Sequence, residues 1–186
     1  KAVYSEFVDA MTQLMSKRRF GPPTDTNVDI GPLARADLRD ELHSQVLRSV
    51  HKGAHITTGG QVPQGVGAFY PPTVLSGVTP GMPAFDEEIF GPVAAVIEAD
   101  DLEDAIRLAN ASPFGLGAAV FTSDLEKGKR VASHCLDAGC CFVNDFVRSD
   151  PRLPFGGIKR SGYGRELSPF GIREFVNIKS LVWPDG

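Results

Sequence analysis

Apolar strand segments alternate with amphipathic helices over residues 92–143, and this alternation constrains the fold more than any other feature of the sequence. Strands are expected at residues 93–97, 117–121 and 140–143, and helices at residues 102–109 and up to about His134. Asp100 or Asp101 would cap the first helix, and Ser123 or Asp124 the second. Strands separated by helices of this length are typical of βαβ units, whose parallel strands are covered on both faces. The sequence therefore predicts an α/β fold with three αβα layers and a mainly parallel sheet.

The first 75 residues predict a second group of elements. Apolar residues at helical spacing predict one helix over residues 4–17 and another from Gly31-Pro32 to about Gly53. Residues 54–58 are a short strand candidate that ends at a Gly-Gly pair. Residues 69–75 form a further candidate, and its paired prolines favour a position at the edge of a sheet.

Composition excludes several classes of protein. The formal charge of −4 disfavours nucleic acid as the main partner, because phosphate contacts need a basic face. No apolar run approaches the length of a membrane span, and no secretory segment opens the chain. Three cysteines, two of them adjacent, do not form a disulfide framework, so a reducing cytoplasm is the expected location.

The segment FDEEIFGPV, residues 85–93, combines three carboxylates with an aromatic ring, a glycine and a proline. In an extended segment, residues two apart point the same way, so Glu88 and Phe90 are expected to face one site. A carboxylate beside a flat ring suits a ribose that carries an aromatic base. The alternative is a solvated acidic turn in which Phe90 is a core ring, and these residues alone favour that alternative.

The segment PFGGIKRSGYGRE, residues 154–166, is a glycine-rich loop with basic residues. Its glycines permit tight turns and a close approach of the backbone to a ligand or to another chain. It lacks the G-x-G-x-x-G pattern of a dinucleotide-binding turn. From its residues alone it is a structured loop of undefined purpose.

Taken in order, FDEEIFGPV, NASPFGLG (residues 110–117) and PFGGIKRSGYGRE resemble the aldehyde dehydrogenase superfamily, and the resemblance covers essentially the whole chain. The run SDPRLPFGGIKRSGYGRELS is most similar to the succinate-semialdehyde dehydrogenase branch. The resemblance implies an NAD- or NADP-dependent oxidation of an aldehyde to the carboxylate. It implies that Glu88 binds the hydroxyls of the nicotinamide ribose and that Phe90 packs near the nicotinamide ring. It also implies a catalytic domain over residues 1–170 and an oligomerisation strand with a tail over residues 171–186.

The resemblance implies that the family's chemical groups lie upstream of this chain. These groups are the cysteine nucleophile, the glutamate base, the oxyanion-hole asparagine and the cofactor domain, so no catalytic residue is assigned here. Cys135, Cys140 and Cys141 are expected in core positions without an activating cation or helix N-terminus. With His134 they lack the second ligand pair of a zinc site, so no metal is expected. The chain by itself is therefore expected to be inactive.

The loop before PFGG lines the aldehyde tunnel in the family, which implies a substrate-binding role for Ser149 and Phe155. Arg148 and Arg152 could also meet a substrate carboxylate, because a guanidinium suits bidentate recognition. Solvated loop charges are an equally good interpretation of both arginines.

Residues 175–183, FVNIKSLVW, are a strand candidate that in the family adds to a sheet of a neighbouring subunit. A homo-oligomer is the favoured interpretation, because an unpaired terminal strand needs a partner; the strand could instead fold back on its own domain. The rival to the enzyme is a stand-alone binding or scaffold module without catalysis. The preference for NAD or NADP cannot be predicted from these residues.

Overall fold

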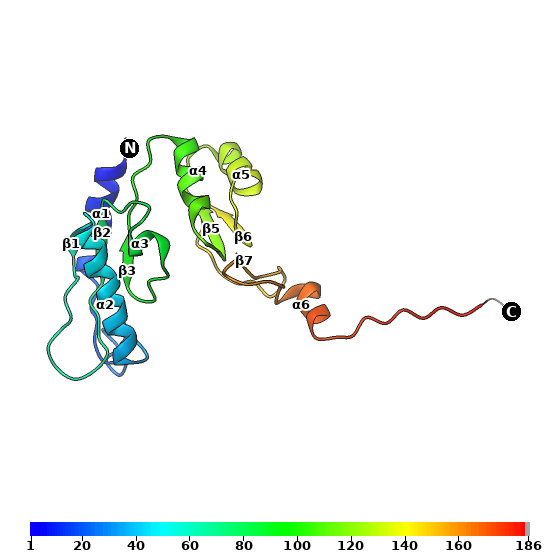
Figure 1. Cartoon of the computed structure of the whole chain (residues 1–186), viewed down its shortest axis with the longest axis horizontal. Helices are drawn as coiled ribbons and strands as arrows, with labels where there is room; N and C mark the ends of the chain where they lie inside the picture. Colours follow the sequence, from blue (N-terminus) through cyan, green and yellow to red (C-terminus); the bar gives the residue numbers. More distant parts are fainter. Residues whose placement is uncertain (185–186) are drawn as a thin grey trace. The chain divides into compact units, whose positions relative to one another are not determined.

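Residues 1–184 are described by a computed structural model (Figure 1), and positions 185 and 186 of the predicted tail lie outside the described residues. The chain divides into two units, Lys1–Ala105 and the part from Ile106 onward. Helix α4 (Leu102–Ala111) spans the point of division. Among residues 1–184, no helix is both long enough and apolar enough to cross a membrane.

The first unit is built on a three-stranded sheet in the order β1-β2-β3. Its elements are α1 (Tyr4–Ser16), α2 (Ala36–His51), β1 (His55–Thr58), β2 (Thr73–Ser76), α3 (Pro83–Asp86) and β3 (Val93–Ala95). Strands β1 and β2 are antiparallel, whereas β2 and β3 are parallel. The predicted edge position of residues 69–75 is wrong, because β2 is the central strand of this sheet. Pro71 and Pro72 precede the ladder and so remove none of its hydrogen bonds.

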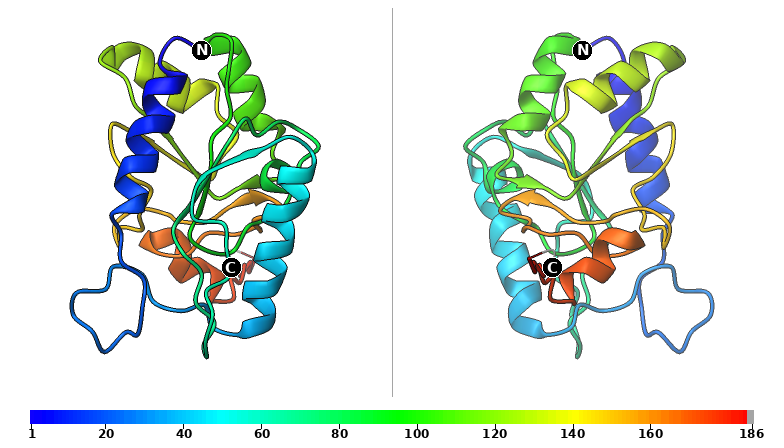
Figure 2. Two further views of the ribbon diagram at one scale, coloured as in Figure 1. Left: turned by 90° about the vertical axis from the view of Figure 1, so that its left-hand side faces the viewer. Right: turned by 90° about the vertical axis from the view of Figure 1, so that its right-hand side faces the viewer.

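Successive residues of β2 supply two apolar clusters. Val74 packs with Val8 of α1, whereas Leu75 packs with Leu42 and Val46 of α2. Because neighbouring side chains on a strand point to opposite faces, the two helices cover opposite faces of this small sheet. Figure 2 shows α1 in dark blue and α2 in cyan on opposite sides of these strands.

The second unit contains the predicted βαβ unit. Strands β5 (Gly117–Val120) and β6 (Cys140–Val143) are parallel, with Gly117 opposite Cys140, and α5 (Leu125–His134) connects them. The Asp124 side chain caps α5 by accepting a hydrogen bond from the Lys127 amide at 3.0 Å. Asp101 accepts one from the Asp104 amide at 2.8 Å near the start of α4. Both caps agree with alternatives that the sequence predicts.

The described strands do not form the single, mainly parallel sheet that the sequence predicts. Residues 1–184 contain one three-stranded and two two-stranded sheets, and β4 (Phe114–Gly115) pairs antiparallel with β7 (Ile158–Lys159). The α/β class is correct, but the sheets are mixed because only some of the strand connections are helical crossovers.

The C-terminal segment carries a short helix, α6 (Ser168–Glu174), and no strand over residues 175–184. The predicted strand is therefore not present in this chain by itself. A strand is defined by pairing with a second strand, and no described segment pairs with these residues. Phe175 and Val182 are 89% and 92% exposed, so the segment presents apolar side chains to solvent.

Candidate functional site

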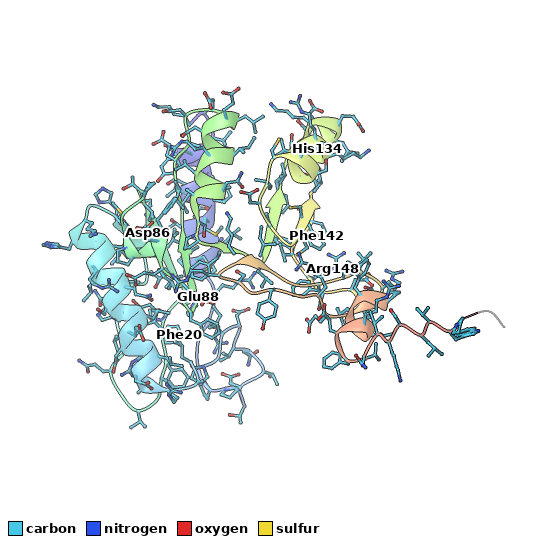
Figure 3. All side chains as sticks on the ribbon, turned by 45° about the vertical axis from the view of Figure 1, so that its right-hand side comes forward. Phe20, Asp86, Glu88, His134, Phe142 and Arg148 are labelled. Atoms are coloured by element: carbon cyan, nitrogen blue, oxygen red, sulfur yellow. The ribbon has the colours of Figure 1, made fainter. Side chains whose placement is uncertain are left out.

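The segment between α3 and β3 alternates between packed and exposed residues. Ile89 packs against the core of the first unit, whereas Glu88 is exposed and Phe90 is 72% exposed. Figure 3 labels Glu88 on this segment and Asp86 at the end of α3. Glu88 and Phe90 are thus directed away from the core while the residue between them is held by it. The 72% exposure of Phe90 excludes it as a core ring of the first unit, and the common facing of Glu88 and Phe90 stays a prediction.

Glu87 fastens the same segment to α2. Its two carboxylate oxygens each accept a hydrogen bond from Arg48, from Nη1 and Nη2, both at 2.9 Å. The bonds from Arg48 and then from Gln45 lower the pKa of the Glu87 carboxyl below its ordinary value. Glu87 therefore stays ionised at neutral pH and keeps its place on the helix.

Gly91 lets the segment close onto α2. A Cβ atom on Gly91 would overlap Cδ1 of Leu42, a residue that is only 2% exposed. The Gly91 amide donates to the carbonyl of Ile89 at 3.0 Å, and the Val93 amide donates to the carbonyl of Gly91 at 2.8 Å. Bonds between residues two apart are the pattern of γ-turns, so Phe90 stands at the tip of a tight bend.

Phe90 borders an apolar cavity of about 470 Å³ within the first unit. The cavity is bounded on one side by the loop and start of α2 and on the other by the segment after α3, with lining residues Ile30, Gly31, Pro32, Leu33, Ala34, Leu38, Ile89, Phe90, Gly91 and Pro92. An exposed carboxylate, an exposed ring and an apolar hollow fit a flat heterocycle on a hydroxyl-bearing sugar. This is the chemistry of the nicotinamide end of a dinucleotide.

The loop after β6 carries the predicted substrate residues Arg148 and Ser149, both of them exposed. Arg148 donates from Nη1 to Oδ1 of Asp145 at 2.6 Å. Arg152 forms a bidentate pair with Asp150, from Nε at 2.9 Å and from Nη2 at 2.7 Å. Each arginine therefore pairs with a carboxylate of its own loop. Arg152 donates two hydrogen bonds to its partner, whereas Arg148 donates one.

Phe155 is half-buried and lines a cavity of about 370 Å³ in the second unit. Its amide and carbonyl exchange backbone hydrogen bonds with Glu166 at 2.9 and 2.8 Å. Nη1 of Arg165, on the same cavity, donates to the carbonyls of Gly157 and Gly164 at 2.9 and 2.6 Å. The cavity walls are thus built largely from the glycine-rich motif itself.

The glycine-rich motif also docks onto the NASPFGLG motif, which the sequence did not reveal. Strand β4 of NASPFGLG pairs with β7, and Nζ of Lys159 donates to the carbonyls of Asn110 and Ser112 at 2.8 and 3.2 Å. The Arg160 guanidinium lies 5.5 Å from the centroid of the Phe114 ring. Lys159 and Arg160 of the glycine-rich motif therefore hold the loop in place and need no ligand to explain them.

Cys140 and Cys141 lie in environments that disfavour a reactive thiolate. Burial raises the pKa of the Cys140 and Cys141 thiols above their ordinary value. The three thiols are free, and residues 1–184 contain no group of His, Cys, Asp and Glu side chains that could hold a metal ion.

The predicted cofactor-binding residues Glu88 and Phe90 belong to the first unit. The predicted substrate-binding residues belong to the second unit, and they are Arg148, Ser149 and Phe155.

Comparison with known proteins gives a consistent result along the whole chain. A profile of the Aldehyde dehydrogenase family matches residues 1–181. The succinate semialdehyde dehydrogenase [NAD(P)+] Sad of Escherichia coli (strain K12) is 47% identical over 185 residues, which are 100% of this chain and 40% of that protein. The succinate-semialdehyde dehydrogenase [NADP(+)] 1 of Mycobacterium ulcerans (strain Agy99) is 48% identical over 181 residues, 97% of this chain and 39% of that protein.

Solved structures show the same similarity in three dimensions. The succinic semialdehyde dehydrogenase of Streptococcus pyogenes, in complex with NADP+, matches with a TM-score of 0.93 and 36% identity over 100% of this chain and 40% of that one. A Mycobacterium tuberculosis aldehyde dehydrogenase complexed with NAD+ matches with a TM-score of 0.92 and 39% identity, over 98% and 38% of the two chains. The chain thus spans about two fifths of the length of these relatives.

Proposed function

The chain belongs to the aldehyde dehydrogenase family, and on that premise we propose that it is part of an NAD(P)-dependent enzyme that oxidises succinate semialdehyde to succinate. In the balanced reaction, the aldehyde, water and the oxidised nicotinamide yield the carboxylate, the reduced nicotinamide and two protons. The aldehyde hydrogen leaves as a hydride, which the bound nicotinamide accepts. The names of the relatives in Escherichia coli and Mycobacterium ulcerans support both this substrate and the use of NAD+ or NADP+.

The observation that carries the proposal is the exposed pair Glu88 and Phe90 on a segment anchored to α2. The Glu88 carboxylate accepts hydrogen bonds from the hydroxyls of the nicotinamide ribose. The Phe90 ring packs near the nicotinamide, beside the apolar cavity that it borders. The chain's contribution at this end of the cofactor is therefore to bind and orient the acceptor of the hydride.

In the second unit, Ser149, Arg148 and Phe155 contribute to binding the aldehyde. Ser149 and Arg148 face the distal carboxylate of the substrate, and Phe155 forms part of the apolar wall along its carbon chain. The nucleophile and the general base belong to the part of the enzyme that corresponds to the remaining length of the relatives. In the complete protein, residues 1–170 form the catalytic domain in a three-layer α/β arrangement. Residues 175–183, which follow α6, form an oligomerisation strand within a homo-oligomer. The cysteine content supports a cytoplasmic location.

The test is an assay of the complete protein with succinate semialdehyde and either NAD+ or NADP+. We expect formation of the reduced nicotinamide together with succinate. A folded complete protein that forms neither product with either cofactor would contradict the proposal and favour a non-catalytic binding or scaffold module.

The 186-residue chain alone is expected to show no aldehyde oxidation, since burial disfavours the thiolate forms of Cys140 and Cys141. The chain and its variant with alanine at Cys135, Cys140 and Cys141 are assayed side by side. Turnover by the unmodified chain that disappears in the triple variant would show that one of these thiols is a nucleophile.

A further inference from the structure

Gln45 is a buried polar residue of α2 that contacts the segment carrying Glu88 at two points. The residue is only 6% exposed to solvent. Nε2 donates to Oε2 of Glu87 at 3.0 Å and to the main-chain carbonyl oxygen of Glu88 at 3.1 Å. A side-chain amide has two N–H donors, so this pair of bonds uses the full donor capacity of the group.

The two bonds differ in what they hold. The bond to Glu87 adds to the bidentate pair with Arg48, and that pair is half-exposed to solvent. The bond to the Glu88 carbonyl has no such duplicate among the described hydrogen bonds of that oxygen. This bond fixes the main-chain carbonyl of Glu88, which is next to the Cα atom that carries the Glu88 side chain.

Neighbouring residues on the same face of α2 anchor the segment on either side of Glu88. Before it, the Ser49 hydroxyl accepts a hydrogen bond from the Ala84 amide at 2.9 Å. After it, Leu42 packs against Gly91. Leu42, Gln45 and Ser49 recur at spacings of three and four residues, which places them along one face of the helix. Gln45 is the middle anchor and the one nearest to Glu88.

We propose that Gln45 is a positioning residue for the nicotinamide end of the cofactor: by holding the Glu88 peptide, it sets where the Glu88 carboxylate meets the ribose. The inference rests on the proposed function of Glu88. It assigns no contact between Gln45 and the cofactor. A misplaced carboxylate weakens the orientation of the hydride acceptor, and small displacements of this kind have large effects on rate.

The test uses Gln45→Met in the complete protein, since methionine keeps the length and helix propensity of glutamine without its donors. We expect hydride transfer in a single turnover to slow by roughly 10-fold or more. The affinity of the protein for the whole cofactor should fall. Its affinity for the adenine half of the cofactor should not change; this half is ADP for NAD+ and 2′-phospho-ADP for NADP+. That split separates a local effect at the nicotinamide ribose from a general loss of structure.

Three further variants sharpen the test. Val74→Ala removes buried atoms from the other face of the sheet, so it should lower stability and leave the single-turnover rate unchanged. Arg48→Ala removes the bidentate pair with Glu87 and no hydrogen bond to the Glu88 carbonyl, so it should slow the reaction less than Gln45→Met. Gln45→Asn, with its amide one methylene shorter, should give an intermediate rate and provides a second measurement if the methionine variant folds poorly.

Three negative results can be distinguished. Unchanged hydride transfer and cofactor affinity in Gln45→Met would overturn the positioning role while leaving the proposed function intact. Equal losses of affinity for ADP and for the whole cofactor would also overturn it, because the effect would then be general. If the unsubstituted complete protein reduces neither NAD+ nor NADP+, the proposed function itself fails.

Discussion

Gly91 and Leu42 pack so closely that no Cβ atom fits between them. Leu42 lies in the buried core on α2, and Gly91 directly follows Phe90 at the tip of the tight bend. The glycine of FDEEIFGPV is therefore required by packing against a helix that begins more than 50 residues earlier in the chain. The requirement would remain even if the segment bound no ligand.

Gly91→Ala is accordingly expected to destabilise the protein. The new methyl group must displace a buried leucine, and overpacking of this kind costs about 1–3 kcal/mol. The free energy of unfolding is measured in urea. Gly31→Ala is the matched control, because no atom lies within 4 Å of a Cβ placed at Gly31. Equal stability of the two variants would show that the core yields to the methyl group without strain.

Stability should fall at alkaline pH through Tyr70. This residue is fully buried, its hydroxyl lies 3.1 Å from Nδ1 of His43, and burial raises its pKa from 10.0 to about 12. The folded state thus favours the protonated phenol. The contribution of the buried, protonated Tyr70 to the free energy of unfolding is fully present below pH 10. It is lost as the pH rises toward about 12.

The loss is on the order of 3 kcal/mol and is measured as the free energy of unfolding across this pH range. Tyr70→Phe should remove the part of the pH dependence that comes from this hydroxyl. Tyr163→Phe is the control, because Tyr163 is 100% exposed. An identical pH dependence in Tyr70→Phe and the unsubstituted protein would contradict the assignment.

Glu88→Gln in the complete protein should leave folding intact and slow hydride transfer. Loss of a charge-assisted hydrogen bond of about 1.5–3 kcal/mol corresponds to roughly a 10- to 150-fold decrease, if the bond acts fully in the transition state. Single-turnover kinetics measures the effect. Asp86→Asn removes a nearby exposed carboxylate and should have little influence. Unchanged hydride transfer in Glu88→Gln would exclude the proposed role.

Arg148 and Arg152 should differ in their effect on substrate choice. Arg152 is held by Asp150 through two hydrogen bonds, whereas Arg148 donates to Asp145 through one nitrogen. We therefore expect Arg148→Ala to lower kcat/KM for succinate semialdehyde much more than for butanal, an uncharged aldehyde of the same length. Arg152→Ala should affect the two aldehydes equally.

The complete protein should itself prefer succinate semialdehyde to butanal, since a polar pocket without its carboxylate partner is costly. Equal kcat/KM values for the two aldehydes would contradict the proposed substrate and leave membership of the family untouched. If Arg148→Ala lowers kcat/KM for both aldehydes by the same factor, the ion pair between Arg148 and Asp145 has a structural role instead.

Local patterns in the sequence were sufficient to predict most of the longer elements. Helix α1, predicted at residues 4–17, spans Tyr4–Ser16, and strand β6, predicted at residues 140–143, spans Cys140–Val143. Each of these features depends on residues within a few positions of one another. Over such short distances, the spacing of hydrophobic residues indicates a helix or a strand directly.

Tertiary structure decided how these elements combine. The central place of β2, the pairing of β4 with β7, and the absence of a strand over residues 175–184 all depend on which distant segments meet, and spacing along the chain carries no such information. The same holds for the support of Glu88. Gln45 and Glu87 are 42 residues apart, and only the packing of α2 against the segment after α3 brings the buried amide to the peptide that it holds.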